Sequence, residues 1–202
     1  YYEKISKQDN RIKVCKFDIN YFNYSAIVNY GVECSNGEYI VMLNNDIEFI
    51  TEDWIEQLLM YAQRPDVGIC GAKLYFPDRS IQHAGVTLGT RGLAGHRCRE
   101  VREKDFKKDD YINIVQDLSA VTAACFMVRK QLYIDMLGFD EKLAVAFNDV
   151  DFCMKIRTAK YLIVYNPFVE AYHYESKSRG EDTENTEKQK RFAKEYELFV
   201  KR

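Results

Sequence analysis

One short apolar run narrows the possible folds of this chain more than any other segment. It extends from Tyr39 to Leu43, with the sequence Tyr-Ile-Val-Met-Leu, and stops abruptly at Asn44, Asn45 and Asp46. An unbroken apolar run of this length is typical of a strand buried on both faces of a parallel sheet. In open α/β sheets, ligands bind beyond the carboxyl ends of the strands. The run therefore predicts an α/β fold in which Asn44 to Asp46 border a binding site.

The remainder of the chain alternates between helical and strand-like patterns, as expected of an α/β domain. Thr51, which two acidic residues follow, has the sequence of a helix start. Further helices are expected at 23–34, 131–136, 148–159 and 187–200, and further strands at 67–76, 120–128, 162–165 and 169–172. We expect a mostly parallel central sheet flanked by helices.

Composition excludes several other classes of protein. The 202 residues suit one domain, and 29 basic against 31 acidic residues lack the positive excess of a nucleic-acid binder. No run approaches the roughly 18 to 20 apolar residues that span a bilayer. The six cysteines are scattered without a Cys-x-x-Cys pair, which favours reduced core thiols in a cytoplasmic protein. Because the chain begins at Tyr1, without an initiator Met or a signal peptide, we expect it to be a piece of a longer protein.

Three polar clusters stand where chemistry is expected. Asp46 offers a carboxylate to Mg²⁺ or Mn²⁺, which in turn binds a substrate diphosphate. Asp149, at a helix start, is placed to accept a proton from a hydroxyl nucleophile. His173 can complete a carboxylate metal site as a neutral imidazole. Each cluster also has a structural explanation: a turn after a strand, an acidic residue that stabilises its helix, and a packed histidine between two tyrosines.

Taken in order, these clusters and the segments between them resemble the family 2 glycosyltransferases, which have the GT-A fold. The resemblance covers positions from Asn20 to Gly180 and depends on the order of many short motifs. The motifs are Asn29-x-Gly31, Gly37 to Ile40, Leu43 to Asp46, Asp53-Trp54, Gly71 to Leu74, Ile81 to Gly85, Val121 to Cys125, Gly138 to Glu141, Phe147 to Phe152 and Tyr172 to Ser176.

The resemblance implies roles for several polar residues in this part of the chain. Asn44 to Asp46 would be this chain's version of the Asp-x-Asp motif, with Asp46 as the principal ligand of Mn²⁺ or Mg²⁺. His173 would be a late metal or diphosphate contact, and Asp149 the catalytic general base. Contacts to the donor are implied for Asn29, Asn44, Asn45 and Arg179, and support of the acceptor or of the base for Thr122, Asn148 and Asp151.

The same resemblance implies the inverting transfer of a sugar from a nucleotide-diphosphate sugar to a hydroxyl of a glycan or lipid-linked glycan. The implied setting is the assembly of bacterial surface polysaccharide, with rhamnosyl transfer as the reaction. The enzyme would work in the cytoplasm, as a peripheral protein at the inner face of the membrane.

One part of the family pattern is absent from the sequence. Family members begin with two strands, the second ending in an acidic pair, that hold the nucleoside, and no such segments precede Asn20. We therefore expect residues 1–180 to form a partial GT-A domain without its nucleoside-binding front. Residues 181–202 are expected to form a charged amphipathic helix docked on that domain.

Two other functions are open at this point. The missing front and Asn44 at the first acidic position favour a catalytically idle GT-A-like module that binds a protein or a glycan. The joint presence of Asp46, Asp149 and His173 favours an enzyme instead. A nucleotidyltransferase would also use strand-end carboxylates and a metal, but the helix start at Asn148 is harder to place in one.

Overall fold

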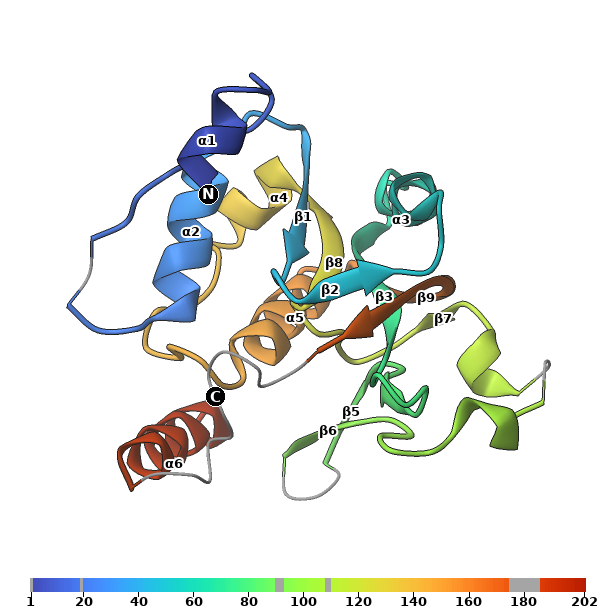
Figure 1. The fold of residues 1–202 in the computed structure, drawn as a ribbon. Coiled ribbons are helices and arrows are strands. Elements are labelled where there is room, and N and C mark those ends of the chain that lie inside the picture. Colours follow the sequence, from blue (N-terminus) through green and yellow to red (C-terminus); the bar gives the residue numbers. More distant parts are fainter. Residues whose placement is uncertain (1, 19, 90–92, 108–109, 175–185) are drawn as a thin grey trace.

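The computed structural model describes residues 2–18, 20–89, 93–107, 110–174 and 186–202 as an α/β structure, and confirms the expected fold class (Figure 1). The helices are α1 (Tyr2–Ser6), α2 (Tyr24–Cys34), α3 (Trp54–Ala62), α4 (Lys130–Asp135), α5 (Asn148–Thr158) and α6 (Thr186–Val200), with the 3-10 helices η1 (Glu103–Asp105) and η2 (Tyr111–Asn113). The strands are β1 (Tyr39–Leu43), β2 (Ile47–Phe49), β3 (Val67–Tyr75), β4 (Ile81–His83), β5 (Val86–Leu88), β6 (Ala94–His96), β7 (Gln116–Asp117), β8 (Cys125–Arg129) and β9 (Leu162–His173).

The central sheet is mixed, not mostly parallel as expected. Its main strands follow the order β1-β8-β3-β9-β2, with β4 beside β3 and β7 beside β9. Among the described strands of this sheet, only β3 and β9 pair in parallel. Because β8 runs antiparallel between β1 and β3, the strands β1, β3 and β9 still point the same way. Their carboxyl ends therefore lie toward one side of the sheet.

The burial of β1 also differs from the expectation. Ile40 and Met42 are buried, whereas Tyr39 and Val41 are half-buried and Leu43 is 45% exposed. The reason is that β1 lies at the edge of the sheet, where one face is only partly covered. In contrast, β3, in the centre of the sheet, is buried at every position.

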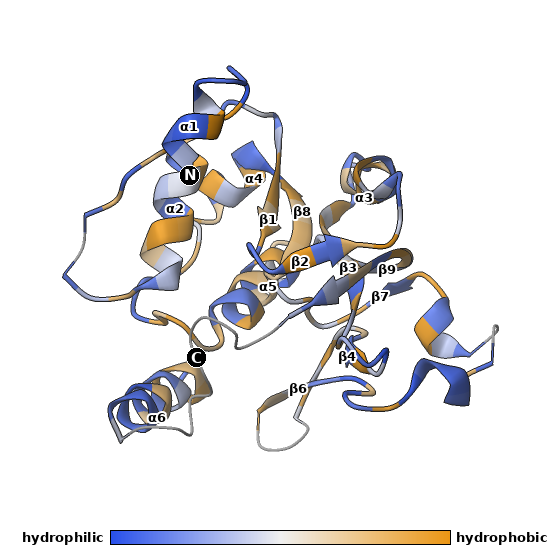
Figure 2. Ribbon diagram, in the orientation of Figure 1, coloured by the Kyte–Doolittle hydropathy of each residue, from blue (hydrophilic) through white to orange (hydrophobic). Residues whose placement is uncertain are grey.

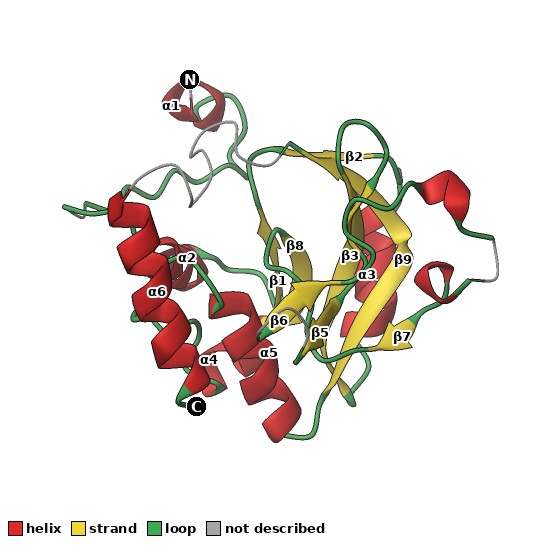
Figure 3. Ribbon diagram, turned by 90° about the horizontal axis from the view of Figure 1, so that it is seen from below, coloured by secondary structure: helices red, strands yellow, loops and turns green. Residues whose placement is uncertain are grey.

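Helices cover both faces of the sheet (Figure 3). Residues of α2, α4 and α5 pack on one face around Phe126 and Phe152, and α3 packs on the other through Leu58 and Ala62. Figure 2 shows that β8 is mostly hydrophobic and α6 mostly hydrophilic. The six cysteines are free thiols, but only three are core residues as expected: Cys70, Cys125 and Cys153 are buried, whereas Cys15, Cys34 and Cys98 are half-buried.

Two local expectations change as well. Thr51 does not cap a helix, because its hydroxyl donates to the carbonyl of Phe168 (2.9 Å) and accepts from the N–H of Glu170 (3.0 Å). The two strands expected at 162–165 and 169–172 are one strand, β9, whose pairing with β3 contains irregularities in register. Thr51 thus holds β9 rather than a helix. Among the residues that the structure describes, no helix has the length and apolarity needed to cross a bilayer.

Candidate active site

The carboxyl ends of β1 and β9 bring two of the three polar clusters together. Asn44 to Asp46 form the turn between β1 and β2, and β2 pairs with β9 so that Ile47 lies opposite His173. As a result, Oδ1 of Asp46 lies 3.2 Å from Nε2 of His173. Nδ2 of Asn44 lies 3.2 Å from the same nitrogen. Asp46, Asn44 and His173 therefore form one cluster.

Gln82, on β4, determines which nitrogen of His173 carries the hydrogen. The side-chain N–H of Gln82 donates to the backbone oxygen of His173 (3.2 Å), and its Oε1 consequently faces Nδ1 of the ring at 2.6 Å. Because a carbonyl oxygen only accepts, Nδ1 carries a hydrogen, and in the neutral form of the ring Nε2 presents a lone pair toward Asn44 and Asp46. A neutral imidazole oriented by such a bond is the form that binds metal ions.

Asp46 has a buried oxygen without a hydrogen-bond partner among the described residues. This atom is Oδ1, which faces Nε2 of His173. Buried polar atoms are nearly always satisfied, and a bound ion is one explanation for an exception. Among the described residues, no three His, Cys, Asp or Glu side chains gather to hold a metal. Oδ1 of Asp46 and Nε2 of His173 can instead serve as two ligands of a divalent cation, which completes its coordination with water and substrate oxygens, as Mg²⁺ usually does.

Asp149 stands at the start of α5, with its carboxylate held by two backbone N–H groups. Oδ2 accepts from the N–H of Ala123 (3.1 Å) and Oδ1 from the N–H of Val150 (2.8 Å). Ala123 belongs to residues 120–124, which precede β8 and were expected to be part of that strand. The two donors orient the carboxylate and leave each oxygen a further lone pair for a hydroxyl proton.

Tyr24, at the start of α2, connects the two halves of the site. Its hydroxyl donates to Oδ1 of Asn44 (3.2 Å) and lies 3.4 Å from the backbone oxygen of Ala123. Burial, and then the carboxylates of Asp149 and Asp46, raise the pKa of the Tyr24 phenol above its usual value. Both carboxylates therefore act on one hydroxyl. No motif in the sequence points to Tyr24, which lies outside the polar clusters.

Thr122 borders the site through its backbone, and Asn148 borders it through its side chain. The N–H of Thr122 donates to Nε2 of His83 (3.3 Å). Asn148 is buried, donates to the hydroxyl of Ser25 (3.1 Å) and accepts from the N–H of Asp149 (2.7 Å). The two side chains thus belong to the frame around the base candidate, and their contact with an acceptor stays a prediction.

The residues expected to contact the donor are in different situations. Oδ1 of Asn29 accepts from the hydroxyl of Tyr133 (2.7 Å) and from the N–H of Phe139 (3.0 Å), which gives Asn29 a structural role after α4. Among the described residues, no hydrogen bond joins Asn29 to the Asp46 cluster, and its donor contact stays a prediction. Asn45 is exposed on the turn after β1. Arg179 lies outside the described residues.

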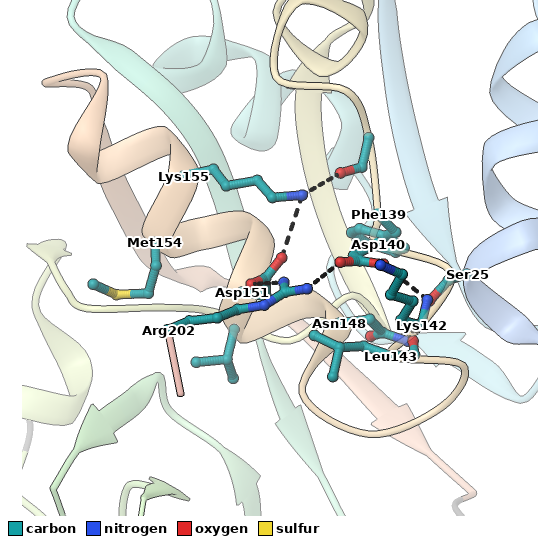
Figure 4. Close-up of polar contacts among 12 residues, drawn as sticks. Ser25, Phe139, Asp140, Lys142, Leu143, Asn148, Asp151, Met154, Lys155 and Arg202 are labelled. Atoms are coloured by element: carbon teal, nitrogen blue, oxygen red, sulfur yellow. Dashed lines mark hydrogen bonds and ion pairs between the residues drawn. The ribbon is translucent and has the colours of Figure 1, made fainter. Parts of the chain in front are cut away.

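Asp151 is buried and is not part of the cluster. It pairs with Lys155 (3.3 Å) and with Arg202, which also binds Asp140 (Figure 4). No hydrogen bond among the described residues joins Asp151 to Asp149. Asp151 therefore anchors α5 and does not bind the carboxylate of Asp149. Its support of the base stays a prediction.

His83 and His96 lie on strands, and His83 contacts the backbone beside the site at Thr122. His83 ends β4, is buried, and its Nδ1 lies 2.8 Å from Nδ1 of His96 on β6. Burial first, and then the nearby His96, His173 and Arg97, lower the pKa of His83 well below its usual value of 6.5. His83 is therefore a neutral residue that supports the turn at Thr122.

A comparison with known sequence families identifies the family of this chain. Residues 1–137 match the profile of Glycosyl transferase family 2. The chain belongs to this family. The matched part includes Asp46, Tyr24 and Gln82, while Asp149 and His173 lie beyond it.

Curated relatives of this family 2 chain are considerably longer. It is 42% identical over 204 residues to the uncharacterised protein y4gI of Sinorhizobium fredii, a match over 100% of this chain and 22% of the relative. It is 35% identical to the O-antigen biosynthesis protein RfbC of Myxococcus xanthus, over 80% of this chain and 13% of RfbC. It is 23% identical to the N-acetylglucosaminyl-diphospho-decaprenol L-rhamnosyltransferase of Mycobacterium tuberculosis, over 72% of this chain and 50% of that enzyme.

Two solved structures confirm the GT-A fold. GalNAc-T7 with UDP, GalNAc and Mn²⁺ has a TM-score of 0.66 at 12% identity, over 85% of this chain and 34% of that one. The mannosyltransferase PcManGT of Pyrobaculum calidifontis, in complex with GDP-Man and Mn²⁺, has a TM-score of 0.62 at 12% identity, over 99% of this chain and 50% of that one. At this identity the likeness is one of fold alone.

Proposed function

We propose that this chain is the part of an inverting glycosyltransferase that binds the donor diphosphate and activates the acceptor. The observation that carries the proposal is the position of Tyr24, whose hydroxyl contacts both Asn44, beside Asp46 and His173, and Ala123, whose N–H donates to Asp149. A reaction in which a diphosphate leaves and a hydroxyl attacks needs a cation site beside a proton acceptor. A carboxylate and imidazole pair with a second carboxylate nearby meets both needs.

Mn²⁺ or Mg²⁺ is the proposed cofactor, with Asp46 and His173 as its protein ligands. Two observations support it: Oδ1 of Asp46 is buried without a hydrogen-bond partner among the described residues, and Nε2 of the neutral His173 ring faces it. Both similar solved structures contain Mn²⁺. When bound, the cation supplies positive charge to the departing diphosphate. Asn44, Asn45 and Arg179 are the proposed donor contacts on this side.

Asp149 is the proposed general base. The oxygen of the acceptor hydroxyl forms a bond to the anomeric carbon while the bond from that carbon to the diphosphate oxygen breaks. The hydroxyl proton moves to the carboxylate of Asp149, whose orientation is set by the N–H groups of Ala123 and Val150. Attack on the face opposite the leaving group inverts the configuration of the sugar.

The names of the relatives support a setting for this chemistry. One relative is named for O-antigen biosynthesis, and another for rhamnosyl transfer to N-acetylglucosaminyl-diphospho-decaprenol. We therefore propose a glycan or lipid-linked glycan as the acceptor and rhamnosyl transfer as the first reaction to test. Work at the inner face of the membrane belongs to the same proposal.

A catalytically idle module is the second candidate, and one observation favours it. Asn44 is neutral and occupies the first acidic position of the family's metal motif. A site with less negative charge attracts a divalent cation less strongly. Such a module would keep the fold without turnover.

The deciding experiment measures nucleoside diphosphate release by the full-length natural protein that contains this chain. The donors are UDP-, GDP- and dTDP-sugars, the acceptor is N-acetylglucosaminyl-diphospho-decaprenol, and Mn²⁺ is present. We expect turnover with one donor, and a loss of about a hundredfold or more in Asp149→Asn with donor still bound. Asp53→Asn, which changes an exposed carboxylate before α3, is the matched control and should keep full activity.

Each outcome separates the candidates. Near-normal turnover in Asp149→Asn would contradict the assignment of the base. Mn²⁺ binding that persists in Asp46→Ala would contradict the assignment of the metal ligand. Absence of turnover with every donor, together with absence of a Mn²⁺ response, would favour the idle module.

A further inference from the structure

The loop that leads to Asp149 is held from two sides. We call residues 139–147, between α4 and α5, the base loop. On one side, the backbone oxygen of Ala144 accepts from the N–H groups of Tyr24 (2.8 Å) and Ser25 (3.3 Å), at the start of α2. The hydroxyl of Ser25 donates to the oxygen of Leu143 (2.5 Å). This side of the loop is thus tied to the helix that carries the site tyrosine.

On the other side, α6 binds the base loop through a buried carboxylate. Glu195 is 2% exposed, and its Oε2 accepts from the N–H of Ala146 (2.7 Å). Arg191, one turn earlier, lies 3.6 Å from Oε1 of Glu195. A helix that merely covers a surface with its apolar side needs no buried carboxylate, because removing a charge from water is costly. Glu195 is therefore a specific contact to the loop backbone.

The residue that precedes α5 has a strained backbone, and α6 packs against its side chain. Phe147 has a φ of 63°, in the left-handed region that bulky residues avoid. Its ring stacks on Phe199, with ring centroids 5.2 Å apart, and contacts Phe192 and Tyr196 at 5.5 Å and 6.2 Å. Strained residues persist only when the surrounding structure holds them. Three aromatic side chains of α6 provide that support.

A third contact lies on the far side of Asp149 along the chain. Arg202, just after α6, binds both Asp151 on α5 and Asp140 in the base loop (Figure 4). Asp151 also pairs with Lys155, and only 5% of it is exposed. The contacts of α6 and of Arg202 thus fall at positions 140, 146, 147 and 151, on both sides of Asp149.

We propose that α6 is a positioning element for the catalytic base, with Glu195 and Phe199 as its positioning residues. This inference rests on the proposed function, in which Asp149 accepts the proton. The 3.1 Å bond from the N–H of Ala123 to Asp149 requires a fixed start of α5. When the base loop loosens, the carboxylate leaves this orientation more often. A small misplacement of a catalytic group lowers the rate strongly while substrate binding is retained.

The test compares Glu195→Gln with Glu197→Gln in the full-length natural protein that contains this chain. Glu197 is exposed on the same helix, so the control loses the same charge without touching the loop. Hydrogen–deuterium exchange of residues 139–151, nucleoside diphosphate release, and the number of Mn²⁺ sites are measured for both. We expect Glu195→Gln to raise exchange in the base loop and to lower kcat about tenfold or more, with an unchanged donor KM.

A second pair of variants checks the aromatic contact. Phe199→Ala removes the ring stacked on Phe147, whereas Phe199→Leu keeps most of the apolar volume. We expect a lower kcat in the first and partial recovery in the second. A purely structural defect would lower the number of Mn²⁺ sites together with kcat, and so retained Mn²⁺ sites identify a positioning effect.

Two results would overturn the inference: equal kcat in Glu195→Gln and Glu197→Gln, or equal exchange of the base loop in the two variants. Asp149→Asn is measured alongside them. Near-normal turnover in Asp149→Asn would show that the assignment of Asp149 as the base is wrong. The hydrogen–deuterium exchange data would still show whether α6 holds the base loop.

Discussion

Replacing Asp46 with Asn should stabilise the metal-free chain and weaken the metal-bound one. Within the part of the chain that the structure describes, Oδ1 of Asp46 is buried without a hydrogen-bond partner, and a buried unsatisfied polar atom costs about 1 to 3 kcal/mol. Asp46→Asn removes the negative charge that faces Nε2 of His173 at 3.2 Å, a nitrogen that Nδ2 of Asn44 already contacts. Since the Asp46 side chain is 21% exposed, water offsets part of this cost and we expect a gain of about 1 kcal/mol. The melting temperature then rises by about 2 to 4 °C.

Thermal unfolding followed by circular dichroism, once in EDTA and once in excess Mn²⁺, measures both effects. At a Mn²⁺ concentration of about 100 times its Kd, binding adds about 2.7 kcal/mol to the wild type alone, and the order of stability reverses. Asp53→Asn is the control and should follow the wild type in both buffers. A variant that unfolds below the wild type in EDTA would refute the cost assigned to Oδ1. A variant that Mn²⁺ stabilises as much as the wild type would refute its role as a ligand.

Three further changes probe the surroundings of the site. Tyr24→Phe removes the donor to Asn44 and should lower the free energy of unfolding by about 1 kcal/mol in urea titrations, so an unchanged midpoint would speak against that bond. Gly138→Ala should lower it by about 1 to 3 kcal/mol, because φ is +59° and the new Cβ would lie 2.6 Å from Oδ1 of Asn29; a neutral effect would contradict this geometry. Burial lowers the pKa of His83 below 6.5, so below that pH the unfolded chain binds the additional proton. The contribution of neutral His83 to the free energy of unfolding is complete above pH 6.5, and it decreases by up to about 1.4 kcal/mol per pH unit as the pH falls. Urea titrations at pH 5 and 7.5 should show a smaller pH dependence in His83→Gln than in the wild type.

The carboxyl end of β1 could be predicted because it depends on local sequence. An apolar run that ends in Asn44-Asn45-Asp46 identifies a strand and the polar turn after it, whatever the direction of the neighbouring strands. The helix start at Asn148 is equally local, since its pattern of acidic and apolar residues repeats within a few turns. These features identified Asp46 and Asp149 as candidate site residues. The order of the motifs indicated the family, which the profile match confirms.

The contacts that join these residues depend on tertiary structure. Tyr24 reaches Asn44 only because the start of α2 lies near the turn after β1, and no pattern near position 24 encodes that contact. The direction of β8 was equally hidden, because an apolar strand has the same composition whether its neighbours run parallel or antiparallel. Thr51 shows the opposite problem. Its sequence fits a helix cap, but bonds to β9 use the hydroxyl instead.

The pairing of β2 with the end of β9 has a consequence for folding. Asn44 and His173 are 129 positions apart in the chain, and the parallel pair β3 and β9 also joins distant segments. Contacts over such separations form slowly, because a long loop must close before they stabilise anything. The cluster therefore cannot assemble in an early, locally folded intermediate. We expect Mn²⁺ binding to recover late during refolding, after most helical signal has returned.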